Sequence, residues 1–114
     1  MPIEFEDSSE TLRTIRISGR LDLIGTDEIA TKFAALSTVS GRQVIVDLTE
    51  VSFLASIGIR SIITNAKALQ QRGGRMVLLV GNNQSVAKTL ETTGIDSLIP
   101  LFSDKAEAEK ALAA

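Results

Sequence analysis

The spacing of apolar residues switches repeatedly between a strand period and a helix period along this chain. Thr11–Ser18 alternates apolar and polar side chains with one break, and Ile3–Phe5 is a candidate short strand before it. Val44–Val46 and Met76–Val80 are short apolar runs, typical of strands that are covered on both faces. Ile99–Phe102 is predicted to form a further short strand. The pattern predicts a sheet of five strands.

Helix-type spacing fills the intervals between these strands. Thr26 is the candidate N-cap of the first helix, which ends before Gly41. Residues 49–55 are expected to form a loop, and Ser56 is the candidate N-cap of the second helix. Gly94 ends the third helix, and Ser103 is the candidate N-cap of the fourth.

The predicted order is therefore ββαβαβαβα. Strands that alternate with helices require parallel or mixed pairing, so we expect an α/β fold with a mixed, mostly parallel sheet. A chain of 114 residues without repeats or a linker is expected to form one domain over residues 1–114.

The residue types that are missing exclude several classes of function. The chain has no His and no Cys, so Ser-His-Asp and Cys-His catalysis, zinc fingers and thiol redox centres are excluded. The acidic residues of the last helix alternate with lysines and are typical of a solvated face, so no metal site and no cofactor are expected. We do not expect an enzyme.

Charge and hydropathy narrow the choice of partners. The net charge is −2 and neither sign forms a block, which disfavours direct nucleic-acid binding. No stretch approaches the roughly 20 apolar residues of a membrane span, and the first ten residues are too acidic for a signal peptide. We expect a soluble, cytoplasmic protein that does not contact a membrane. Monomer and weak dimer both stay open, because the edge strand at Ile3–Phe5 is available for pairing between chains.

The segment Val44–Ile63 holds the most informative motif. A buried strand leads through a short loop to Ala55-Ser56-Ile57-Gly58 at the start of a helix. A serine there commonly caps the helix, and it also lies at the positive end of the helix dipole, where a phosphate would meet free N–H groups. Gly58 leaves the backbone of the first turn open. The spacing leaves both interpretations open.

Three features resemble the STAS domains of anti-sigma-factor antagonists. They are Gly19-Arg20-Leu21-Asp22 after the early strand, Val46–Thr49 with Val51 and Phe53, and Ser56-x-Gly58 before an amphipathic helix that ends at Gly73-Gly74. The predicted element order is also that of the family, so the resemblance extends over nearly the whole chain and implies a single STAS-like domain.

The resemblance implies a switch that works by binding a protein. Ser56 would be phosphorylated by a partner that is both a serine kinase and an anti-sigma factor, and the unphosphorylated form would bind that partner. A cognate serine phosphatase would reset the switch. ATP and magnesium come with the kinase, so this chain is the substrate and needs no cofactor.

Ala55 stands where the family usually has an Asp. It favours an alternative, a STAS interaction or scaffold module that is not phosphorylated in another signalling complex. A small enzyme or nucleotide-binding protein is the weakest hypothesis, since Gly81-Asn82-Asn83 matches no phosphate-binding motif and is better explained as a turn with a helix cap.

The expected partner surface surrounds the phosphorylation site Ser56. Asp22 is either a partner contact or a loop carboxylate bound by nearby N–H groups, and Arg60 faces either a partner or solvent. The residues expected to bind the partner are Asp22, Phe53, Leu54, Ala55, Ser56, Ile57, Gly58 and Arg60.

Overall fold

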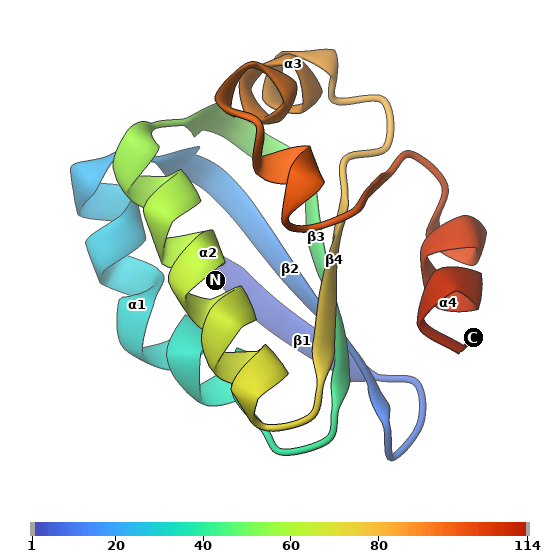
Figure 1. Cartoon of the computed structure of the whole chain (residues 1–114). Helices are drawn as coiled ribbons and strands as arrows, with labels where there is room; N and C mark the ends of the chain where they lie inside the picture. Colours follow the sequence, from blue (N-terminus) through green and yellow to red (C-terminus); the bar gives the residue numbers. More distant parts are fainter. Residues whose placement is uncertain (1, 114) are drawn as a thin grey trace.

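One five-stranded sheet, in the order β1-β2-β3-β4-β5, organises the chain in a computed structural model that describes residues 2–113 (Figure 1). β1 pairs antiparallel with β2, and every other neighbouring pair is parallel. The predicted α/β class and order ββαβαβαβα are confirmed. The elements are β1 (Ile3–Asp7), β2 (Leu12–Leu21), α1 (Leu23–Ser37), β3 (Gln43–Leu54), α2 (Ser56–Gln71), β4 (Arg75–Leu79), α3 (Gln84–Thr93), the 3-10 helix η1 (Ile95–Ser97), β5 (Leu101–Phe102) and α4 (Lys105–Ala113).

The helices cover both faces of the sheet, but unequally. Parallel strands that are adjacent in both sequence and space need right-handed crossovers, which put α1, α2 and α3 on one face. The larger core lies there and includes Val44 and Val46, whereas Ile45 points to the other face and packs with Ala108 and Leu112 of α4. Figure 1 shows α4 alone on its side of the sheet. Because Val44–Val46 is fully buried, the prediction of a strand covered on both faces is confirmed.

The carboxyl ends of β2 and β3 are longer than the sequence suggests. Residues 49–54 belong to β3, so the predicted loop over 49–55 is wrong. They pair with the end of β2, where Phe53 lies opposite Arg20 and Leu54 opposite Leu21. The register shifts on both sides of Gly19, whose φ is +85°, a conformation that glycine adopts without strain. The pairing of β2 with β3 therefore continues past the irregularity to the ends of both strands.

Two helix caps also differ from the prediction. α1 begins at Leu23, and its cap is Asp22, whose Oδ1 accepts a hydrogen bond of 2.9 Å from the Gly25 N–H. Thr26 lies inside the helix and is buried. At α4, the capping bond goes to Asp104 Oδ1, which accepts from the Ala106 N–H, and not to Ser103. The third helix does end at Gly94, as predicted.

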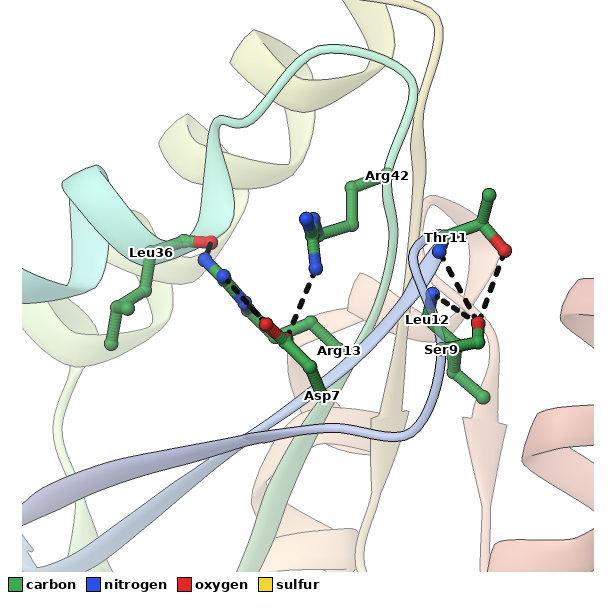
Figure 2. A network of polar contacts seen from close by, with 7 residues as sticks. All are labelled: Asp7, Ser9, Thr11, Leu12, Arg13, Leu36 and Arg42. Atoms are coloured by element: carbon green, nitrogen blue, oxygen red, sulfur yellow. Dashed lines mark hydrogen bonds and ion pairs between the residues drawn. The ribbon is translucent and has the colours of Figure 1, made fainter.

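An ion-pair network fastens the amino-terminal ends of the parallel strands (Figure 2). Arg13 Nε lies 2.7 Å from Asp7 Oδ1, and Arg42 Nη1 lies 3.1 Å from the same oxygen. Arg13 also donates to the Leu36 carbonyl near the end of α1. These contacts tie the β1–β2 hairpin to α1 and to the start of β3, at the opposite end of the sheet from the start of α2.

Within residues 2–113, no helix combines the length and apolar character that crossing a membrane requires.

Candidate functional site

The predicted site residues come together at the carboxyl ends of β2 and β3. The Ala55 N–H donates a hydrogen bond of 3.0 Å to the Leu21 carbonyl. Asp22 and Ser56 are the next residues along each chain segment, so the first turns of α1 and α2 start side by side. Two stretches more than thirty residues apart in sequence therefore form one surface.

Two glycines allow this close approach of the helices to the strands. A Cβ atom on Gly58 would lie 3.0 Å from the Leu21 carbonyl oxygen and from Leu54 Cδ1. A Cβ atom on Gly25 would lie 1.8 Å from the Arg20 carbonyl oxygen, which no side chain can tolerate. The first turn of each helix is thus held directly against the end of β2.

Ser56 is the first helical residue of α2 and not its N-cap, so that prediction is wrong. Ala55 occupies the cap position with extended backbone angles, and no side chain supplies a capping hydrogen bond. The first helical bonds run from the Gly58 and Ile59 N–H groups to the Ala55 carbonyl. Ser56 is exposed, and its hydroxyl is therefore accessible at the amino-terminal end of the helix dipole.

Three large apolar side chains are exposed at this end of the sheet. Leu23 is 69% exposed, Ile24 73% and Phe53 42%, and we call these three residues the carboxyl-end patch. Phe53 is one of the predicted residues, whereas the sequence reasoning missed Leu23 and Ile24. The sequence could have indicated that Ile24 is exposed, because Ile24 falls between the positions that repeat along the buried face of α1.

Arg20 links the patch to the cap of α1. Its guanidinium carbon lies 4.4 Å from the centroid of the Phe53 ring, and its Nε lies 3.3 Å from Asp22 Oδ2. The hydrogen bond from the Gly25 N–H, reinforced by Arg20, lowers the pKa of Asp22 below its ordinary value. Both interpretations of Asp22 are therefore compatible with its position, since it caps α1 and also lies beside the carboxyl-end patch.

The remaining predicted residues divide by exposure. Leu54 is only 6% exposed and belongs to the core, because the continued β2–β3 pairing turns it inward. Gly58 is also buried, so these two residues support the surface from beneath and do not line it. Ala55 and Ile57 are half-buried, and Arg60 is exposed.

Comparison with known proteins identifies the family. Residues 3–108 match the family model described as "STAS domain". The chain belongs to the STAS domain family.

Several known proteins resemble this chain over nearly its whole length. An "Anti-sigma-B factor antagonist" of Listeria monocytogenes is 25% identical over 105 residues, which are 92% of this chain and 91% of that protein. An anti-sigma factor antagonist from Mycobacterium paratuberculosis superposes with a TM-score of 0.86 at 20% identity, covering 98% of this chain and 93% of the other. SpoIIAA of Bacillus, solved in its phosphorylated form, gives a TM-score of 0.66 at 19% identity over 96% and 98% of the two chains.

Two neighbouring polar groups of this STAS domain have structural roles. Asp47 Oδ1 accepts hydrogen bonds from the N–H and hydroxyl of Thr49. Asn83 caps α3 by accepting from the Val86 N–H, and its amide group donates to the Val51 carbonyl at 2.7 Å. The prediction of a turn with a helix cap at Gly81–Asn83 is confirmed. In the part of the chain that the structure describes, no three carboxylates are grouped to hold a metal ion.

Proposed function

We propose that this STAS domain is an anti-sigma-factor antagonist whose binding to its partner is controlled at Ser56. The partner is a protein that is both a serine kinase and an anti-sigma factor, and the unphosphorylated form binds it. The proposal draws on the names of the relatives. The observation that carries it is the exposed hydroxyl of Ser56 at the start of α2, beside the carboxyl-end patch.

The partner surface consists of the residues that are accessible around Ser56. Large apolar side chains that stay exposed on a small domain mark interaction sites when they gather in one area. We propose that Leu23 and Ile24 extend the surface predicted from the sequence, and that Leu54 and Gly58 only support it. The partner-binding residues are then Asp22, Leu23, Ile24, Phe53, Ala55, Ser56, Ile57 and Arg60.

Phosphorylation would release the partner by local electrostatics. A phosphoserine adds about −1.5 to −2 charges at neutral pH. Inside the complex, the added phosphate at Ser56 would be buried against an apolar surface, which strongly disfavours association unless a matching arginine is present. In the free domain the phosphate would lie at the positive end of α2, where the helix dipole favours it. No rearrangement of the domain is required, and a cognate serine phosphatase would restore the binding form.

Ala55 supports a second candidate, a STAS interaction or scaffold module that is never phosphorylated. The side chain of Ala55 offers the first turn of α2 neither a capping hydrogen bond nor a charge. A kinase that recognised the usual Asp at this position would lose that contact. In this case the same surface binds its partner regardless of ATP.

The decisive experiment follows both phosphate and partner. The purified protein is incubated with MgATP and lysate of its source cells under phosphatase inhibition, and phosphate is mapped by mass spectrometry. Phosphate on Ser56, with a partner that is recovered without ATP and lost with MgATP, supports the switch. Ser56→Ala should keep the partner in MgATP, whereas the control Ser52→Ala, at an exposed serine on β3, should behave as wild type. An unmodified Ser56 with a partner that ignores MgATP supports the scaffold.

We also propose that the domain, spanning residues 1–114, acts in the cytoplasm as a monomer or weak dimer, without direct contact to nucleic acid or membrane. The charges of the edge strand support weak self-association at most. Glu4, Glu6 and Asp7 lie on β1, so antiparallel pairing of two copies through this edge would bring like charges together.

A further inference from the structure

A cavity of about 300 Å³ lies at the far end of α2 from Ser56. Its walls come from the second half of α2, the start of β4 and the segment between η1 and β5. Its lining includes Ile63, Ala66, Lys67, Met76, Leu98 and Ile99. This volume is at the lower end of the range for small-molecule sites, which is roughly 300–1,000 Å³.

The lining combines apolar and polar side chains. Met76 is 6% exposed and Ile99 3%, so both present apolar atoms from the core, while Leu98 is 64% exposed at the rim. Lys67 and Gln70, one helical turn apart on α2, contribute an ammonium and a carboxamide. A mostly apolar lining with a few polar groups is the usual composition of a ligand site.

The charged residues that line the cavity are all basic. No acidic residue lines the cavity, and Lys67 makes no ion pair with a carboxylate within residues 2–113. Arg75 is a second cation of the lining, and its Nη1 also donates to the Ala111 carbonyl of α4 at 3.4 Å. Lys67, on the same helix as Gln70, is thus available to pair with an anionic group entering the cavity.

We infer that this cavity binds a small monocarboxylate with an apolar body, such as a medium-chain fatty acid. The carboxylate pairs with Lys67 and accepts from the Gln70 amide. The apolar body lies against Ile63, Met76 and Leu98. The site is separate from the surface around Ser56 and does not depend on the function proposed for it.

The test is a titration of the intact protein with octanoate, below its micelle concentration, followed by methyl NMR. The methyl resonances of Ile63, Met76 and Ile99 should shift and saturate. Those of Leu23 and Ile24, which are exposed at the other end of the sheet, should not shift. Octan-1-ol, which has the same chain without the charge, should bind about three- to fivefold more weakly, because the ion pair with the exposed Lys67 ammonium is lost.

The variant Lys67→Gln isolates the charge. It should weaken octanoate binding by about three- to fivefold, the upper range for an exposed ion pair, and leave octan-1-ol unchanged. The matched control Lys32→Gln, at an exposed lysine on α1, should have no effect on either probe. Leu98→Ala, at an exposed side chain of the rim, should weaken both probes together and serves as a second variant.

Four results would overturn the inference. They are the absence of saturable shifts at the cavity methyls, equal shifts at Ile24, equal weakening by Lys67→Gln and Lys32→Gln, and shifts of the cavity methyls on raising the protein concentration alone. The last result would show that a second copy of the chain covers this face.

Discussion

The Arg20 guanidinium lies over the ring of Phe53, 4.4 Å from its centroid, while its Nε contacts Asp22. Arg20 on β2 and Phe53 on β3 lie opposite each other in the sheet, so their stacking depends on the irregular end of the β2–β3 pairing. One side chain therefore fixes both an apolar residue of the carboxyl-end patch and the cap of α1.

A double-mutant cycle between Arg20 and Phe53 should show this coupling. We expect Arg20→Gln and Phe53→Leu to couple by about 0.5–1 kcal/mol in the free energy of unfolding, the usual strength of an exposed cation–π contact. Urea denaturation of the single and double variants measures it. The control cycle pairs Arg16→Gln with Phe53→Leu, because Arg16 instead faces Asp47. Equal coupling in both cycles would contradict a specific stack.

Gly25→Ala should destabilise the fold severely. Alanine would gain about 1 kcal/mol of helix propensity, but its Cβ would lie 1.8 Å from the Arg20 carbonyl oxygen, which is backbone and cannot rotate away. We expect a net loss of at least about 3 kcal/mol in the free energy of unfolding. Gly19→Ala is the matched control, since no atom lies within 4 Å of its Cβ position and only the positive φ opposes it, at about 1–2 kcal/mol. Similar losses in the two variants would argue against close packing of α1 on β2.

The Asp7 network should make stability depend on pH (Figure 2). Hydrogen bonds from Arg13, with the charges of Arg13 and Arg42, lower the pKa of Asp7. Because the pKa of Asp7 is lower in the folded state than the unfolded value of about 3.9, the ionised carboxylate stabilises the fold fully at pH values above about 3.9. This stabilisation is lost as the pH falls through the folded-state pKa. The urea midpoint of wild type should therefore exceed that of Asp7→Asn most at pH 7, and the gap should narrow below about pH 4.

Glu6→Gln is the control for this pH dependence. Glu6 is exposed on the same strand and forms no ion pair in the described part of the chain. Its urea midpoint should follow wild type over the same pH range. If the difference in urea midpoint between wild type and Asp7→Asn stays constant with pH, the charge of Asp7 does not contribute to stability.

The strands were predictable because their burial is local in sequence. A run such as Val44–Val46 has no polar position, so both of its faces must be covered whatever the tertiary details. The alternation of strand and helix then fixed the crossovers and the element order. Gly94 likewise ended its helix in the left-handed conformation, φ +76°, that favours glycine.

The details of the site were less predictable because they depend on contacts between distant segments. Asp22 and Thr26 are both good capping types, and the packing of Gly25 on Arg20 selects the earlier one. Leu54 and Phe53 are both apolar, and only the pairing of β3 with the irregular end of β2 decides which is buried. The positions of Leu23 and Ile24 follow from that choice of cap.

Removing the two exposed apolar side chains at the start of α1 should weaken partner binding but leave the stability of the fold nearly unchanged. The double variant Leu23→Ser/Ile24→Ser should change the free energy of unfolding by no more than about 0.5 kcal/mol per site, because both side chains are mostly exposed. Its affinity for the proposed anti-sigma-factor partner should fall at least about 30-fold, the effect of losing an interface hot spot. Calorimetric titration with the partner measures this. Leu98→Ser, similarly exposed but away from the patch, should bind as wild type.

A negative charge introduced at Ser56 should weaken partner binding without weakening the fold. Ser56→Asp places a carboxylate in the first turn of α2, where the helix dipole should raise stability by about 0.3–1 kcal/mol. Partner affinity should nevertheless fall at least about 30-fold, because the charge would be desolvated in the interface. Ser52→Asp carries the same charge on an exposed position of β3 and controls for net charge, and Ser56→Ala should bind as wild type. If Ser56→Asp folds and binds as tightly as Ser56→Ala, control by local charge is wrong, and the exposed serine is an incidental feature of a scaffold surface.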